Sequence, residues 1–119
     1  MLVSFPIVEL IDRLVISKIK LEKSNINQAE FDYYNTQANK FDLTKINSQL
    51  LELEQIHNSI WNLESDLKNG VEHQHSLEEI GRRAIAIRDL NNQRIKLKNE
   101  MAELLGCSVR EIKKDHLSE

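Results

Sequence analysis

IHNSIWNLESDL, residues Ile56 to Leu67, lies in a longer stretch whose apolar residues recur at every third or fourth position. That interval is typical of an α-helix with one buried face. On a helical projection, His57 and Glu64 lie within about 30° of the mean apolar direction, and Trp61 lies between them on the adjoining row. The stretch therefore predicts a long packed helix that carries polar groups on its buried side. Its apolar seam comprises Leu43, Ile46, Leu50, Leu53, Ile56, Ile60, Leu63 and Leu67.

A second long helix is predicted after a short polar loop. Ser76 and Glu79 match the S-x-x-E pattern of a capped helix start, and Gly106 suits the left-handed position that ends a helix at about Leu105. Gly70 would end the preceding helix in the same way, and Asp42 or Thr44 would cap its start. Two long helices joined by a short loop form an antiparallel hairpin.

The first helix is predicted to begin near Ser4 or Phe5, because a proline at the first turn loses no intrahelical donor, and to end near Ser24. It is apolar over well over half of its circumference, which is typical of a helix surrounded by neighbours. Its charged side chains form one stripe, which also contains Ile16. The stripe either borders a cavity or a subunit interface or is an ordinary solvated face. Its charged members are Glu9, Asp12, Arg13, Lys20 and Lys23.

Two shorter segments complete the pattern. Phe31, Tyr34, Ala38 and Phe41 recur at helical spacing, which predicts a second helix after a turn at residues 24–27, or else an extension of the first helix. A short terminal helix is predicted for residues 108–117.

Composition favours a helical fold throughout. The 119 residues are 40% hydrophobic but include three Gly and one Pro, so the turns that a sheet needs are scarce. We predict one all-α domain, residues 1–119, without β-sheet. It would be an antiparallel helical bundle built on two long helices and the N-terminal apolar helix.

The charge and the cysteine content of the chain indicate which kinds of partner to expect and in which compartment the protein is expected. The formal net charge is −3, and the 16 Lys and Arg residues are interleaved with acids, so the clustered basic face of a nucleic-acid binder is missing. Cys107 is the single cysteine, and the N-terminal residues have neither the basic flank nor the apolar length of a signal peptide or membrane span. We therefore expect a cytoplasmic protein with no nucleic-acid or membrane partner.

The two long helices carry complementary polar interruptions. A buried carboxylate such as Glu64 is costly unless it meets a cation, a donor, a metal or a proton. On the second long helix, polar residues interrupt the apolar seam that runs through Leu77, Ile80, Ala84, Ile87, Met101 and Leu105. The acids expected to face them are Glu9, Asp12, Glu64 and Asp66, and the opposing group is Arg88, Asn91, Arg94 and Lys98.

Three functions are compatible with this cluster. The favoured one is a pocket for a small anionic or phosphorylated ligand, held by the basic side chains, oriented by Asn91 and stacked on Trp61. The second is a buried ion-pair network that fixes the pairing of a homo-oligomer, with His57 as a satisfied core histidine. The wide apolar arc of the first helix also favours a homo-oligomer.

The third is a metal-dependent nucleotide hydrolase. Glu9 and Asp12 have the E-x-x-D spacing of paired acids, but Glu64 and Asp66 point about 200° apart on a helix. His73 and His75 are expected to be solvated, and Cys107 has no neighbouring base. We predict no metal and no cofactor, and whether the protein is an enzyme stays open.

ELIDRLVISKIKLEK from Glu9, IWNLESDLK from Ile60 and IRDLNNQRIKLKNEMAELLG from Ile87 together resemble an uncharacterised family of short all-helical bacterial proteins, a domain of unknown function. The family usually has Asn-Asp where this chain has Asn91-Asn92. The resemblance implies one shared site but no activity. The positions that it implies are Glu9, Asp12, Lys20, Trp61, Glu64, Asp66, Asn91 and Arg94.

Overall fold

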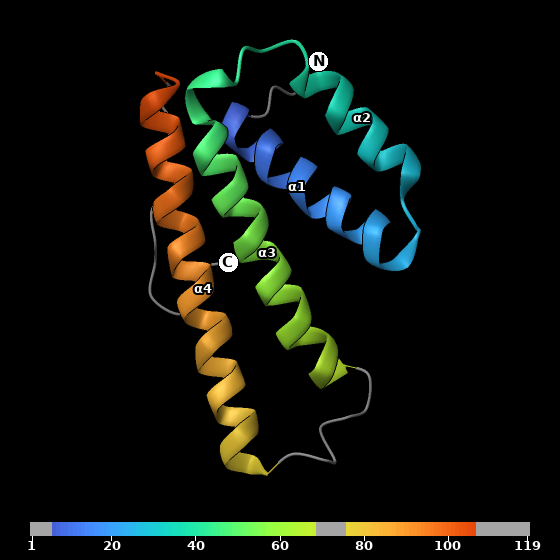
Figure 1. Ribbon diagram of the computed structural model, residues 1–119, viewed down its shortest axis with the longest axis vertical. Helices are drawn as coiled ribbons and strands as arrows, with labels where there is room; N and C mark the ends of the chain where they lie inside the picture. Colours follow the sequence, from blue (N-terminus) through green and yellow to red (C-terminus); the bar gives the residue numbers. More distant parts are fainter. Residues whose placement is uncertain (1–5, 69–75, 107–119) are drawn as a thin grey trace.

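The computed structural model describes residues 6–68 and 76–106, without the side chains of residues 66–68 (Figure 1). This part of the chain holds helices α1 (Ile7–Ser24), α2 (Gln28–Ala38), α3 (Asn47–Lys68) and α4 (Leu77–Leu104), with a 3-10 turn, η1 (Thr44–Ile46), directly before α3. No strand occurs among these residues. The prediction of an all-α fold is confirmed.

Helices α3 and α4 run antiparallel, side by side, and α1 crosses one end of this hairpin (Figure 1). Helix α2 packs on α1. Helix α1 thus has three helices as neighbours, which accounts for the wide apolar arc of its sequence. The free end of the hairpin, formed by the start of α4 and the end of α3, extends away from α1 (Figure 1).

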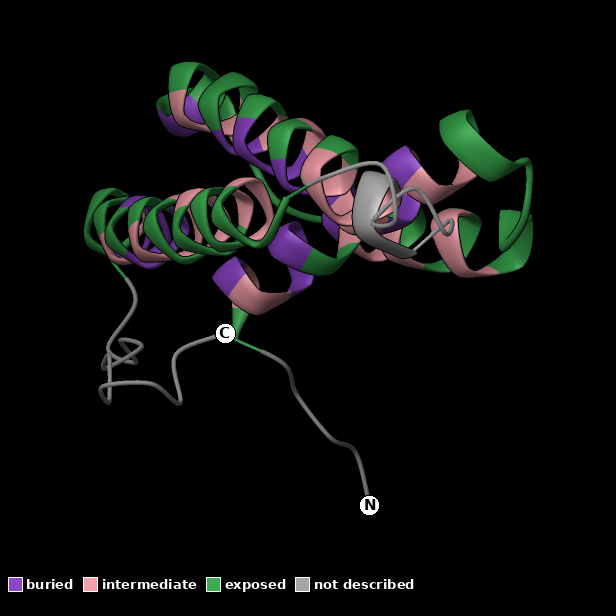
Figure 2. Ribbon diagram, turned by 90° about the horizontal axis from the view of Figure 1, so that it is seen from below, coloured by how far each residue is buried: buried purple, intermediate pink, exposed green. Residues whose placement is uncertain are grey.

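The hydrophobic core lies where α1 meets the hairpin. Ile11, Ile46, Leu53 and Met101 are completely buried, and Figure 2 shows the buried positions on the sides of the helices that face one another. Burying one such side chain contributes roughly 1.5–3 kcal/mol. The core also contains Val8, Val15, Ile19, Ile56, Ile60, Leu97 and Ala102.

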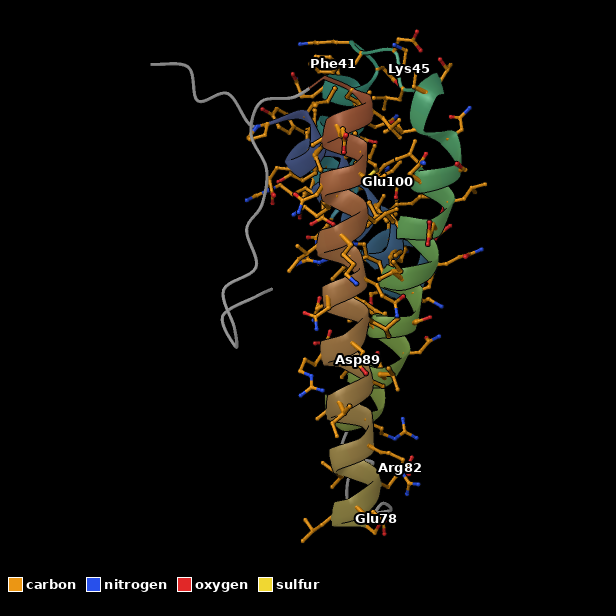
Figure 3. The ribbon with its side chains drawn as sticks, turned by 90° about the vertical axis from the view of Figure 1, so that its left-hand side faces the viewer. Phe41, Lys45, Glu78, Arg82, Asp89 and Glu100 are labelled. Carbon is orange, nitrogen blue, oxygen red and sulfur yellow. The ribbon has the colours of Figure 1, made fainter. Side chains whose placement is uncertain are left out.

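The predicted seam of α4 is wrong at its N-terminal end. Leu77 is 87% exposed and Ala84 is also exposed, because α1 covers the opposite end of the hairpin. The outer face of α4 carries charged side chains along its length, among them Glu78, Arg82 and Asp89 (Figure 3).

The ends of α4 follow the predicted capping chemistry. The Ser76 hydroxyl accepts a hydrogen bond of 3.1 Å from the backbone N–H of Glu79. Gly106 has a φ of 72°, and its N–H donates to the carbonyl of Glu103. A left-handed residue at this position favours glycine, because a Cβ is strained there.

The turn between α1 and α2 depends on two asparagines in the left-handed region, Asn25 with φ 53° and Asn27 with φ 66°. Asn tolerates this conformation better than most residues with a side chain. The predicted turn and separate second helix are therefore confirmed.

Some predicted helix boundaries need correction, and others lie outside the described residues. Pro6 has an extended ψ of 140° and precedes α1, so the helix begins after the predicted Ser4 or Phe5. Phe41 lies beyond the end of α2 and is 49% exposed. The predicted end at Gly70 and the helix at residues 108–117 fall outside the described residues.

Among the described helices, none has the length and apolar character that crossing a membrane requires.

Candidate functional site

Asp12 is the centre of a buried polar network that joins α1 to the hairpin. Its Oδ1 lies 2.7 Å from Nε2 of His57, and its Oδ2 lies 3.0 Å from a terminal nitrogen of Arg94 and 3.7 Å from Nζ of Lys98. All four residues are buried, with Asp12 only 2% exposed. A carboxylate so far from water requires compensation of this kind, and removing one partner leaves an uncompensated charge. We call these four residues the Asp12 network.

The environment of Asp12 keeps it ionised at neutral pH. Burial alone would raise the pKa of this carboxyl, but the hydrogen bond with His57 and the positive charges of Arg94 and Lys98 together lower the pKa below its ordinary value. A carboxylate accepts hydrogen bonds and cannot donate them. His57 therefore donates through Nε2, and its Nδ1 is the ring nitrogen that does not contact Asp12.

Glu9 extends the network toward the surface. Its Oε2 lies 3.0 Å from Nζ of Lys98, and its Oε1 lies 3.6 Å from Nε of Arg13. Lys98 is 4% exposed and lies between the carboxylates of Glu9 and Asp12. The predicted opposition of acids on the first helix to bases on the last helix is therefore present in the structure.

A cavity of about 310 Å³ lies beside the Asp12 network, between α1, α3 and α4. Isoleucines of α1 and α3 form part of its wall, and among them is Ile16, the apolar residue within the charged stripe of α1. The stripe thus borders a cavity, one of the alternatives expected from the sequence. We call this space the three-helix cavity. Its remaining lining residues are Lys20 from α1, His57, Trp61 and Glu64 from α3, and Asn91 and Arg94 from α4.

Several polar groups of the three-helix cavity have no partner among the described residues. The ammonium of Lys20, the carboxylate of Glu64 and the amide of Asn91 form neither a hydrogen bond nor an ion pair there. Nε of Arg94 is buried without a hydrogen-bond partner, although the same guanidinium binds Asp12. The Asp12 network is thus closely paired, whereas the adjoining cavity retains unused donors and acceptors.

A second depression, of about 290 Å³, adjoins the network from the side of α2. Tyr34 and Glu30 of α2 contribute to it, and it shares Ile16, Lys20 and Arg94 with the three-helix cavity. Lys20 and Arg94 therefore lie where the two spaces meet.

The structure brings most of the predicted site residues to these two neighbouring spaces. The three-helix cavity holds five of them, and Glu9 and Asp12 line the second depression. Lys98 lies against the two acids of α1 instead of the three-helix cavity. The side chain of Asp66 lies outside the described part. The five in the cavity are Lys20, Trp61, Glu64, Asn91 and Arg94.

Arg88 is the predicted residue that the fold places elsewhere. Its side chain is 67% exposed and lies 3.6 Å from Asp89 on the outer face of α4. The physical reason is helical geometry, because residues six positions apart, such as Arg88 and Arg94, point about 120° apart. Arg88, which a helical projection of the sequence places at the border of the apolar seam, therefore points into solvent.

His57 was predicted to lie on the buried side of its helix but was not among the predicted site residues, yet it lines the three-helix cavity. Its buried position within the apolar seam was the available signal, since a polar ring there needs a partner. The partner is Asp12, 45 residues earlier in the chain. That pairing depends on how α1 crosses α3, which helical periodicity does not specify.

Within residues 6–68 and 76–106, no grouping of three or more His, Cys, Asp or Glu side chains is arranged to hold a metal ion. Glu9 and Asp12, the pair considered for a hydrolase, are engaged by Lys98, Arg94 and His57. His73, His75 and Cys107 lie outside the described residues.

The chain matches no family model, no curated protein and no solved structure. The resemblance to a family of short helical proteins therefore stays a prediction, and a functional proposal depends on the geometry of the cavity.

Proposed function

We propose that the protein binds a small ligand with an anionic group, a carboxylate or a phosphate, in the three-helix cavity. The observation that carries the proposal is Lys20, a half-buried cation without a described partner, which lines the same cavity as the buried guanidinium of Arg94. Two cations from different helices that converge on one space provide a site for an anion.

Arg94 is held in place for this role by Asp12. The 3.0 Å contact with Asp12 fixes the guanidinium, so little side-chain entropy is lost when a ligand binds. Its Nε is buried and forms no hydrogen bond within the described residues.

Trp61 and Asn91 supply the other contacts of a small-molecule site. The indole offers a flat apolar surface on which a planar ligand group can stack, and the amide offers one acceptor and two donors. Ligand pockets combine an apolar wall with a few converging polar groups, and their volumes begin at roughly 300 Å³. The three-helix cavity has both properties.

The experiment is a thermal-shift series with inorganic phosphate, phenyl phosphate, benzoate and a set of amino acids, followed by titration of those that stabilise. A ligand at 100 times its Kd stabilises the folded state by about 2.7 kcal/mol. The stabilisation should be lost in Lys20→Gln and kept in Lys23→Gln, which removes an exposed lysine of the same helix. Equal stabilisation of both variants, or none by any of these anions, would refute the proposal.

Assembly into a homo-oligomer is the second candidate function. Leu77 at 87% exposure and Ile85 at 51% lie on the half of α4 that α1 leaves uncovered. A second copy of the chain would bury them and gain apolar contact area. Light scattering should then give a mass that is a multiple of 13.9 kDa, and Leu77→Gln should reduce it. A monomeric mass at high protein concentration would contradict assembly.

A further inference from the structure

We infer that the ligand of the three-helix cavity is zwitterionic, a small amino-acid-like molecule whose acid group lies against Lys20 and Arg94 and whose protonated amine is bound by Glu64 and His57. The inference rests on the proposed anion site and adds a second recognition element to it.

Glu64 provides the first indication. Its side chain lines the cavity, is half-buried and has no described ion-pair partner, whereas Asp12 and Glu9 both face cations. A half-buried carboxylate without compensation is unfavourable, and a cationic group of the ligand would compensate it. A ligand with negative charge alone would instead meet repulsion from Glu64.

His57 provides the second indication that the ligand carries an amine. Nε2 faces Asp12, and in the tautomer that carries its proton on Nε2 the other nitrogen, Nδ1, is an acceptor. No hydrogen bond joins Nδ1 to another described residue. Since His57 lines the three-helix cavity, this nitrogen provides a second acceptor for a ligand N–H.

The polar lining is divided between helices. Both unpaired acceptors, Glu64 and His57, are on α3, whereas the cations come from α1 and α4. His57, Trp61 and Glu64 are spaced four and three residues apart, so they share one face of α3 over roughly 10 Å. A molecule between the helices would thus meet acceptors on one wall and cations on the other walls, which matches opposite charges at its two ends.

The size of the cavity limits the ligand to a small molecule. A volume of about 310 Å³ is at the lower end of the roughly 300–1,000 Å³ range of ligand pockets. That space suits one amino acid or a molecule of similar size, with an apolar or planar part against Trp61 and the isoleucines.

The test compares matched pairs of ligands that differ by the amine. The full-length protein is titrated with the standard amino acids, γ-aminobutyrate and 5-aminovalerate, and with the acids that lack their amino group, such as 3-phenylpropionate for phenylalanine. At least one amino acid should bind about tenfold or more tightly than its deaminated partner, the range expected for one charge-assisted hydrogen bond. Glu64→Gln should remove that advantage, whereas Glu52→Gln, at an exposed position of α3, should leave it intact.

The outcomes separate this inference from the proposed function. Equal binding of amino acids and their deaminated partners overturns the zwitterionic ligand and leaves the anion site standing. Binding of phenyl phosphate or benzoate together with no binding of any amino acid has the same meaning. An amine advantage that survives in Glu64→Gln also overturns the inference. Absence of binding by every probe, with or without an amine, overturns both.

Discussion

Nε2 of His57 and Oδ1 of Asp12 lie 2.7 Å apart in the interior, between two helices that are distant in the sequence. This contact engages one ring nitrogen of the histidine and leaves Nδ1 without a hydrogen bond to any described residue. The same carboxylate holds Arg94 beside the three-helix cavity. The buried ion-pair network and the proposed ligand site therefore share residues.

Replacing Asp12 tests the structural part of this network. Asp12→Asn removes the charge that compensates buried Arg94 and Lys98, so the free energy of unfolding should fall by about 3–5 kcal/mol. Urea unfolding at neutral pH measures the change. Asp89→Asn, at an exposed position of α4, is the matched control and should change stability by less than about 1 kcal/mol. A similar small effect for both variants would show that the Asp12 network adds no stability.

The lowered pKa of Asp12 predicts how stability depends on pH. A group whose folded pKa lies below its unfolded value of 3.8 binds more protons when unfolded, so its contribution is present above pH 3.8 and is lost as pH falls through the folded pKa. The difference in unfolding free energy between the natural chain and Asp12→Asn should be constant near neutral pH and shrink below pH 3.8. Denaturant unfolding at a series of pH values gives this difference. A difference that grows toward acid would contradict the direction of the shift.

Two leucines of α3 test the placement of the core. Leu53 is completely buried and Leu51 is 64% exposed, although they are two positions apart. Leu53→Ala should lower the free energy of unfolding by about 2–5 kcal/mol through lost burial and a cavity, while Leu51→Ala should cost less than about 0.5 kcal/mol. Chemical denaturation of both variants measures the contrast. Similar costs would mean that α3 is rotated relative to the described structure.

Two arginines of α4 test which basic residue belongs to the site. Arg94→Gln removes a buried partner of Asp12 and a cation of the cavity, so it should reduce both stability and ligand binding. Arg88→Gln removes a solvent-exposed side chain and should change neither. Unfolding experiments and ligand titrations on the two proteins provide the comparison. A loss of ligand binding in Arg88→Gln would show that Arg88 belongs to the site and would contradict its placement on the outer face of α4.

Much of the fold follows from the sequence, because helical periodicity and capping are local. The seam from Ile46 to Ile60, the Ser76 cap and the turn at Asn25 were predicted from residues within a few positions of one another. The exposure of Leu77 could not be predicted in this way, because it depends on which end of the hairpin α1 crosses.

The candidate site was predictable in its types of residue but not in its pairing. A buried acid requires a cation, which is why bases on α4 were expected opposite acids on α1. Which base meets which acid depends on the crossing geometry of three helices, so the contacts of His57 and Lys98 with Asp12 emerged from the structure. The exposed position of Arg88 has a different cause, since Arg88 points about 120° away from Arg94 on the same helix.

Trp61 allows the most direct measurement of the central claim, because it is the single tryptophan of the chain and it lines the three-helix cavity. Its fluorescence should change saturably when phenyl phosphate, benzoate or the amino acids are titrated into the protein. The change should disappear in Lys20→Gln and persist in Lys23→Gln. If none of these molecules alters the fluorescence of Trp61, or if Lys20→Gln responds as the natural chain does, the three-helix cavity is not an anion-binding site.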